Sequence, residues 1–238
     1  MTSKTVVLFG AGPGLGKAIA RKFGGGGFRV AVSSRSQERA AALADSLRDE
    51  GIEAAGFAAD VTQPETLNSA VAQIRQRFGK IDVLEFSPLP SMSPPVSMSA
   101  AGTTSDLARA LFEFQVIGAV NAVRAVLPEM LERRSGTILI TTGGSAHIPV
   151  PFITPVGMAM AACRNYALCL HAELASQGIF VACVSIGAMI KEGDPFSDPG
   201  KLAQTYYELY QRRDRADVLL MDPNSLAQLK ASVETAKP

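Results

Sequence analysis

The sequence is poor in the residues that build metal sites and disulfide frameworks. Only three cysteines, Cys163, Cys169 and Cys183, and two histidines occur among its 238 residues. Three is an odd number, and the spacing shows no metal-like pairing. We therefore expect small, buried cysteines in a reducing compartment. Two histidines are too few for a histidine-rich metal site, so the sequence predicts no metal centre.

An excess of one charge and long apolar runs are also missing. The 23 basic and 22 acidic residues leave a formal net charge of +1, and no basic face stands out. Nucleic acid is therefore not an expected partner. The chain leads directly from residues 1–4 into an apolar strand without a secretory segment, and no apolar run predicts a membrane span. We expect a cytoplasmic protein that takes a small-molecule substrate or ligand and contacts no membrane.

Hydrophobic residues are plentiful, at 47%, which is enough for one large domain over residues 1–238. Short apolar runs alternate with amphipathic helical patterns. This alternation predicts an α/β fold with a single Rossmann-type, doubly wound parallel sheet of order 3-2-1-4-5-6. Residues 217–221 are the one stretch left for a seventh strand. The expected strands are residues 6–9, 28–33, 52–59, 81–86, 137–142 and 179–185, and the expected helices are about 15–23, 37–50, 64–78, 105–132, 155–177 and 201–213.

A glycine-rich turn joins the first strand to the first helix. Gly10, Gly14 and Gly16 form the pattern G-x-x-x-G-x-G. Glycine is needed where the backbone has a positive φ or where a ligand approaches closely. The unpaired amides of the helix's first turn, together with the helix dipole, suit a pyrophosphate. A P-loop is excluded because Lys17 is followed by Ala18 rather than by Ser or Thr. A close packing turn without a ligand is the alternative.

Residues 87–102 interrupt the periodic pattern with prolines, serines and methionines. A loop of this length is unusual in a compact domain, and such loops are commonly functional lids or disordered segments. Methionines supply an adaptable apolar surface. A lid and an ordinary surface loop both remain open as interpretations.

Several motifs, taken in their order along the chain, resemble those of the short-chain dehydrogenase/reductase superfamily. The resemblance covers residues 4 to about 190 and implies an NAD(P)-dependent oxidoreductase that forms a homodimer or homotetramer. It places a cofactor on Gly10, Gly14, Leu15, Gly16, Asp60, Val61, Ser87 and Gly187. The motifs are the glycine turn, Asp60-Val61 after the third strand, Asp82-Val83-Leu84 in the fourth, Leu127-Pro128-Glu129-Met130, and His171-Ala172-Glu173-Leu174 in a late helix.

The end of the second strand indicates which cofactor is preferred. NAD-selective members of the family carry an Asp there, whereas this chain has Ser34 followed by Arg35. A carboxylate would repel a 2′-phosphate, while a guanidinium attracts it and stacks on adenine. The resemblance therefore implies NADP rather than NAD. An exposed arginine on the loop before the helix is the alternative.

The family's catalytic positions carry different residues here. The family uses an Asn, a Ser, a Tyr and a Lys, and alignment of the motifs places Gln115, Gly143, Val156 and Met160 at these positions. Hydride transfer to a carbonyl needs a proton donor or an electrostatic hole for the developing alkoxide. We therefore expect no ordinary ketone reductase or alcohol dehydrogenase activity. No tyrosine of the chain has a lysine four residues later; the four are Tyr166, Tyr206, Tyr207 and Tyr210.

Three residues at or just beyond the end of the fifth strand are candidates to replace the missing acid. Thr142, Ser145 and His147 are expected above the carboxyl edge of the sheet, where ligands bind in this architecture. A second hypothesis is a non-catalytic cofactor-binding or regulatory module that keeps the fold. A methyltransferase is a third, which Ser34 and Arg35 argue against. The tyrosines of the late helix are expected to pack over the cleft.

The two long helices predict association between copies of the chain. Residues 105–132 and 155–177 carry apolar side chains on more than one face. A helix that only covered a sheet would need a single apolar face. An isologous contact about a two-fold axis would cover the second face, so we expect at least a homodimer.

Overall fold

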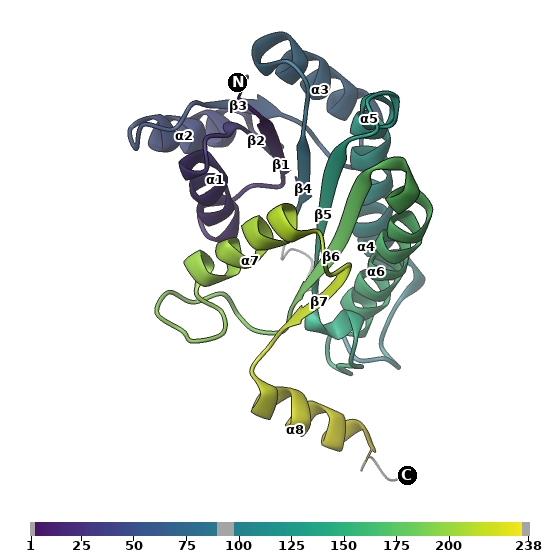
Figure 1. Cartoon of the computed structure of the whole chain (residues 1–238). Helices are drawn as coiled ribbons and strands as arrows, with labels where there is room; N and C mark the ends of the chain where they lie inside the picture. The colour runs from purple at the N-terminus through teal and green to yellow at the C-terminus, as the bar shows by residue number, and fades with distance from the viewer. Residues whose placement is uncertain (1–2, 90–97, 235–238) are drawn as a thin grey trace.

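The computed structural model describes residues 3–89 and 98–234, and in them a single seven-stranded parallel sheet forms the centre of the molecule (Figure 1). The strand order is β3-β2-β1-β4-β5-β6-β7. The predicted order of the first six strands is confirmed, and a seventh strand follows in the stretch left for it. The strands are β1 Thr5–Phe9, β2 Arg29–Ser34, β3 Ala54–Ala58, β4 Val83–Phe86, β5 Gly136–Gly143, β6 Ile179–Ile186 and β7 Asp217–Leu220.

Helices cover both faces of this sheet because its strands are apolar on both sides. Along β1, Val6 and Leu8 enter one core cluster, and Val7 and Phe9 enter the other. Alternate side chains of a strand point to opposite faces, so a continuous apolar run needs two covering layers. One layer contains α1 Leu15–Gly25, α2 Gln37–Arg48 and α7 Pro199–Arg212; the other contains α3 Pro64–Phe78, α4 Ser105–Phe112, α5 Gly118–Glu132 and α6 Thr154–Leu174.

The helix expected over residues 105–132 is interrupted. A π-helical turn, Glu113–Ile117, separates α4 from α5. Within this turn Gln115 is almost fully buried, and π-turns of this kind occur frequently at functional sites. The periodicity of the sequence does not reveal the extra residue in the turn, because helical spacing resumes on both sides of it.

The stretch Ser105–Glu132 also corrects the expectation about membrane spans. By length and composition alone it is long and apolar enough to cross a membrane. In the fold, Ala119, Val123 and Val126 of α5 are buried in the core against the sheet. The apolar character of the stretch is explained by this packing.

The last part of the chain differs most from expectation. An eighth helix, α8 Pro223–Glu234, follows β7 in a stretch whose sequence carries no clear helical signal. Tyr207 and Tyr210 of α7 do not pack over the cleft as expected. They lie against Phe28 and Phe23 beside α1, with ring centroids 5.1 Å apart for Phe28 and Tyr210 and 5.2 Å apart for Phe23 and Tyr207. The reason is that α7 packs along α1, which brings four aromatic rings together.

The loop expected over residues 87–102 is described only at its ends. Residues 90–97 lie outside the described part of the chain, so the interpretation of this loop as a lid stays a prediction. At its far end, Met98 forms an isolated parallel bridge with Ile153, just before α6. Met98 therefore lies beside the start of α6.

Candidate functional site

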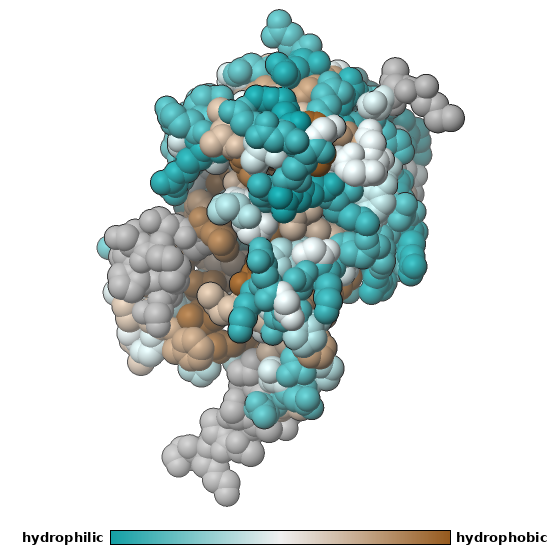
Figure 2. Space-filling model, turned by 90° about the vertical axis from the view of Figure 1, so that its left-hand side faces the viewer, coloured by the Kyte–Doolittle hydropathy of each residue, from teal (hydrophilic) through white to brown (hydrophobic). Residues whose placement is uncertain are grey.

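A cleft of about 1090 Å³ lies at the carboxyl edge of the sheet, beside the point where the strand order reverses between β1 and β4. In α/β folds, ligands bind at such a switch point. Figure 2 shows hydrophobic residues gathered around a hollow on the side of the molecule that faces left in Figure 1. The cleft wall comprises residues 10–17, 34–36, 39, 42, 43, 46, 59, 61, 87–89, 114, 141–143, 160, 186, 188 and 190.

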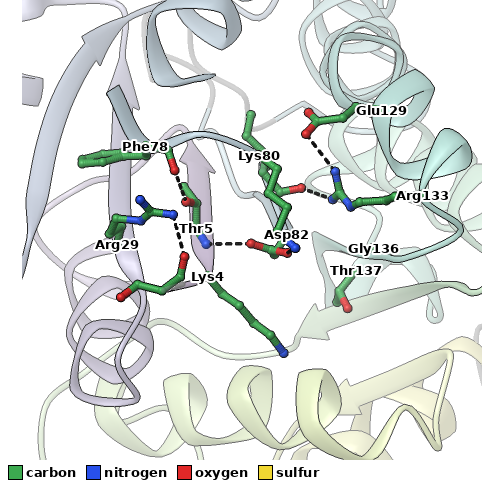
Figure 3. A network of polar contacts seen from close by, with 12 residues as sticks. Lys4, Thr5, Arg29, Phe78, Lys80, Asp82, Glu129, Arg133, Gly136 and Thr137 are labelled. Atoms are coloured by element: carbon green, nitrogen blue, oxygen red, sulfur yellow. Dashed lines mark hydrogen bonds and ion pairs between the residues drawn. The ribbon is translucent and has the colours of Figure 1, made fainter. Parts of the chain in front are cut away.

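The opposite edge of the sheet carries a different polar network (Figure 3). The carboxylate of Asp82 accepts a hydrogen bond from the backbone N–H of Thr5 at 2.9 Å, and the Thr5 hydroxyl donates to the Phe78 carbonyl at 3.3 Å. These bonds tie the beginnings of β1 and β4 together. Asp82, one of the family-like motif residues, therefore supports the sheet far from the cleft.

The glycine turn leaves room for an anion. Gly10 has a φ of +88°, and a Cβ atom there would lie 2.3 Å from the Cα atom of Pro88, so only glycine fits. A Cβ atom on Gly16 would lie 2.8 Å from the Cα atom of Ala11. Gly14 stands at the N-cap of α1 with no side-chain cap, and α1 has no acidic residue in its first turn. The free donors of the first turn therefore face the cleft with a positive helix dipole behind them.

Two guanidinium groups line the cleft beside α2. Arg35 is exposed and makes no hydrogen bond or ion pair with the residues that the structure describes. Arg39, one turn into α2, also lines the cleft, although no sequence motif singles it out. Ser34 donates to the Ser36 carbonyl at 2.7 Å, and the Ser36 hydroxyl caps α2 by accepting from the Arg39 N–H at 3.2 Å. This end of the cleft is therefore suited to a phosphate.

The remaining predicted cofactor residues fall into two groups. Leu15, Val61 and Ser87 belong to the cleft wall, together with the glycines of the turn. Asp60 and Gly187 lie next to lining residues without forming part of the wall. Oδ1 of Asp60 accepts from the Thr62 N–H at 2.9 Å, and the Gly187 N–H donates to the Leu220 carbonyl at 2.9 Å. Both therefore hold the backbone of the segments that line the cleft.

The four positions predicted for the catalytic set meet near α6. Gly143 and Met160 line the cleft, and Val156 stands in the first turn of α6. Gln115 is buried in the π-turn, where its Nε2 donates to the Thr141 carbonyl at 3.3 Å. Its Oε1 is buried without a hydrogen-bond partner among the described residues. Glycine and the apolar side chains of Val156 and Met160 therefore occupy the three positions at which the family has hydroxyl and ammonium groups.

The short chain dehydrogenase family model matches residues 4–192. The chain belongs to this family. This membership favours the oxidoreductase hypothesis over the methyltransferase hypothesis. Among the described residues, no cluster of three or more His, Cys, Asp and Glu side chains could hold a metal ion.

Curated relatives of this family member include dehydrogenases of bacteria and fungi. Cyclohexanol dehydrogenase of Rhodococcus sp. (strain TK6) is 30% identical over 209 residues, covering 79% of this chain and 74% of the relative. A short chain dehydrogenase of Pseudocercospora fijiensis (strain CIRAD86) is 27% identical over 193 residues, covering 81% of this chain. This chain spans 62% of the length of that relative.

Solved structures share the fold at lower identity. A single-residue variant of actinorhodin polyketide ketoreductase with NADPH has a TM-score of 0.82 at 24% identity, covering 91% of this chain and 95% of the ketoreductase. L-Sorbose reductase of Gluconobacter frateurii, complexed with NADPH and L-sorbose, has a TM-score of 0.81 at 22% identity, covering 93% and 96%. These likenesses show that the whole described fold is that of the family.

His147 is not one of the residues that line the cleft in this family member. Its Nε2 lies 2.9 Å from the Ser185 hydroxyl and 3.7 Å from Oδ1 of Asp217, and Arg164 pairs with the same Asp217. In a serine–histidine–aspartate triad the two partners occupy opposite ring nitrogens, which is not the case here. Burial lowers the pKa of His147, Arg164 lowers it further, and Asp217 opposes them. Through these contacts, His147 links Ser185 of β6 to Asp217 of β7, which Arg164 of α6 also pairs. This arrangement suits a structural role for His147 and not that of a catalytic base.

The other two candidate acids stand closer to the cleft. Thr142 lines it, but its hydroxyl lies 2.7 Å from the buried Ser185 hydroxyl. The Ser145 hydroxyl has no hydrogen bond with the described residues, and it lies 3.5 Å from where a Cβ atom on Gly143 would stand. Ser145 is therefore beside the position that a catalytic serine would occupy, without being part of the cleft wall.

A buried glutamate that belongs to none of the sequence motifs lies directly beneath the cleft. Glu85 of β4 is fully buried, and burial raises the pKa of its carboxyl to about 7. The hydroxyls of Ser87 and Thr141 donate to its two oxygens, each at 2.9 Å. Thr141 also lies 2.7 Å from the phenol of the buried Tyr206. The available signal was a single acidic residue inside an otherwise apolar strand.

Glu85 should make the stability of the protein depend on pH. Its folded-state pKa of about 7 lies above the ordinary value of 4.5, so the folded protein keeps the proton while the unfolded chain loses it. The free energy of unfolding should therefore fall between about pH 4.5 and pH 7, by on the order of 3 kcal/mol from this group. Glu85→Gln should remove this decrease and be more stable than the parent near pH 8. Denaturant unfolding at about pH 5 and pH 8 measures it.

The control is Glu173→Gln, which changes an exposed glutamate of α6. This variant should keep the pH profile of the parent. An identical profile in Glu85→Gln and the parent would contradict the assignment of the buried charge.

Proposed function

We propose that this family member binds NADP(H) in the cleft at the carboxyl edge and lacks ordinary carbonyl reduction by the family mechanism. The cleft offers an uncapped helix N-terminus for a pyrophosphate and the guanidinium groups of Arg35 and Arg39 for a 2′-phosphate. The family is one of oxidoreductases, and two structures that share its fold are NADPH complexes. The presence of Val156 and Met160 where a proton donor and its activator are needed carries the second half of the proposal.

The residues present fit the cofactor in a defined order along the cleft. Gly10, Gly14, Leu15 and Gly16 would bind the pyrophosphate, with Ser34 and Arg35 toward the phosphorylated ribose. Asp60 and Val61 would hold the segment beside the adenine, whereas Ser87 and Gly187 belong to the nicotinamide side. When bound, the cofactor supplies a hydride donor or acceptor, and the chain supplies the orientation and the exclusion of water.

Arg35 should discriminate NADP(H) from NAD(H). A charge-assisted contact with the 2′-phosphate is worth about 1.5–3 kcal/mol, so Arg35→Ala should lose most of the preference. Isothermal titration with both cofactors measures it. Arg109→Ala is the matched control, because it removes an exposed arginine of α4 whose ion pair is with the nearby Asp106. Equal affinities in the parent, or an unchanged preference in Arg35→Ala, would refute the assignment.

Turnover of ketones, quinones and enones with NADPH should stay near background. General acid catalysis and a preorganised oxyanion donor each contribute about 10²–10⁴ in rate, and both are missing at the expected positions. Grafting Gly143→Ser, Val156→Tyr and Met160→Lys together should raise turnover by about 10²-fold or more. A Cβ atom fits at Gly143, since its nearest contact would be 3.5 Å from Ser145 Oγ.

The matched control for the graft carries Val156→Phe in place of Val156→Tyr, which keeps the ring and omits the hydroxyl. It should remain inactive while it still binds NADPH. Turnover by the parent chain at about 1 s⁻¹ or more, within the usual range of enzymes, would overturn the expectation. A non-catalytic cofactor-binding or regulatory module is the alternative function, and it is favoured if the graft gains activity that the parent lacks.

We also propose that the chain forms at least a homodimer through α5 and α6. Ala159, Cys163 and Ala167 of α6 face the core, while Met158 and Ile117 remain 45% and 41% exposed. Static light scattering at micromolar concentration should give at least twice the chain mass of 25.0 kDa. Met158→Lys should weaken the association, and Arg109→Ala should not. A monomeric parent chain would contradict this proposal.

A cytoplasmic location remains part of the proposal. Cys163, Cys169 and Cys183 are all free; Cys163 and Cys183 are buried as expected, whereas Cys169 is exposed. Free thiols of this kind are typical of a reducing compartment.

A further inference from the structure

A buried acid beneath the cleft has no part in the function proposed so far. Glu85 lies in the middle of the sheet, and its two oxygens accept hydrogen bonds from Ser87 and Thr141. Both hydroxyl residues belong to the cleft wall, so the carboxyl is one side chain away from a bound ligand. A fully buried carboxyl is costly to ionise without a compensating charge, so its position requires an explanation.

The place of Glu85 along the cleft follows from the polar groups around it. The glycine turn follows β1, and Arg35 follows β2, so the phosphorylated adenosine half of the cofactor would lie over the ends of β1 and β2. A dinucleotide crosses the switch point from there to the other half of the sheet. Ser87 directly follows β4 and Thr141 lies near the end of β5, which places both under the nicotinamide half. This step rests on the proposed binding of NADP(H).

The carboxylate has no compensating cation. Its pKa is set first by burial and then by the two hydroxyl donors, and no cation of the described chain contributes to it. Among titratable groups, the phenol of Tyr206 from α7 faces it through Thr141, and the Cys183 thiol of β6 lies on the opposite core face. Lys17 of α1, which also lines the cleft, has its ammonium group 3.7 Å from the carboxylate of Glu50. A positive charge brought by a ligand would therefore be the first to offset the ionised carboxyl.

The hydrogen bonds also change with protonation. The ionised carboxylate only accepts, so Ser87 and Thr141 both direct their hydrogens toward it and present lone pairs elsewhere. The protonated carboxyl donates one hydrogen bond, which frees one hydroxyl to donate toward the cleft. Both the charge and the donor pattern under the nicotinamide half therefore depend on a single proton.

We propose that Glu85 makes the cleft select between the two redox forms of the cofactor, favouring NADP⁺ when its carboxyl is ionised. The nicotinamide ring carries a positive charge in NADP⁺ and none in NADPH. An ionised carboxyl in a site of low dielectric attracts the oxidised ring and offers nothing comparable to the reduced one. By linkage, binding of NADP⁺ expels the proton from Glu85, while binding of NADPH leaves it in place.

The test measures the dissociation constants of NADP⁺ and NADPH by isothermal titration from about pH 6 to pH 8.5. The ratio Kd(NADPH)/Kd(NADP⁺) should rise with pH through neutrality, by about tenfold for each unit of difference between the pKa values of Glu85 in the two complexes. Titration in two buffers of different ionisation enthalpy should show a larger proton release with NADP⁺ than with NADPH. The 2′-phosphate and the adenine titrate in both cofactors, so their effects cancel in the ratio.

Glu85→Gln keeps the shape and the hydrogen-bonding oxygen of the side chain and should give a ratio that does not change with pH. His147→Gln is the matched control, because a histidine could produce the same sign of pH dependence while its ring lies outside the cleft wall. It should keep the pH dependence. A flat ratio in the parent, or a persistent slope in Glu85→Gln, would overturn the inference while leaving cofactor binding intact. Absence of binding by both cofactors at every pH would overturn the proposed function as well.

Discussion

The parallel pairing of β1 with β4 is the constraint on which the cleft depends. This pairing reverses the strand order and separates the connections that leave the two strands. The chain after β1 turns sharply at Gly10, and the chain after β4 passes so close that any side chain at Gly10 would collide with Pro88. The two loops are therefore fixed against each other at the floor of the cleft. From this contact, α1 leads to one side with an uncapped N-terminus, and the carboxyl ends of β4 and β5 form the other side.

Two sets of polar side chains that differ in charge balance lie on opposite faces of the sheet near its carboxyl edge. On the α6 face, Asp217 is paired with Arg164, and His147 and Ser185 complete a set of neighbouring hydrogen bonds. The charge in that set is compensated, which suits a structural role. On the α7 face, Glu85 has hydroxyl partners and no cation, so its ionisation depends on what binds nearby. The two groups therefore differ in charge balance as well as in burial.

Local patterns in the sequence were sufficient for the sheet and for one wall of the cleft. The strand order and the glycine turn follow from short-range periodicity and backbone chemistry. The π-turn at Gln115 and the packing of Tyr207 beside α1 depend on contacts between distant segments, and neither changes the local pattern. Asp60 and Gly187 show the same limit of local patterns. Their positions in the motifs predicted that they lie near the cofactor, but only the fold shows that they support the cleft wall instead of forming part of it.

The polarity of the cleft is distributed differently from that expected of a carbonyl reductase. Where the family motif expects a phenol and an ammonium group on α6, this chain has Val156 and Met160, and the wall at that side becomes apolar. Among the described residues, the fully buried acid below the cleft is Glu85 of β4. It is not exposed in the cleft itself, and hydrogen bonds from the Ser87 and Thr141 hydroxyls connect it to the cleft wall. A donor on α6 can reach a substrate beside the cofactor, whereas a carboxyl under the sheet edge acts through the electrostatic potential of the whole site. The position of Glu85 therefore suits the proposed selection between the two forms of the cofactor better than the delivery of a proton to a substrate.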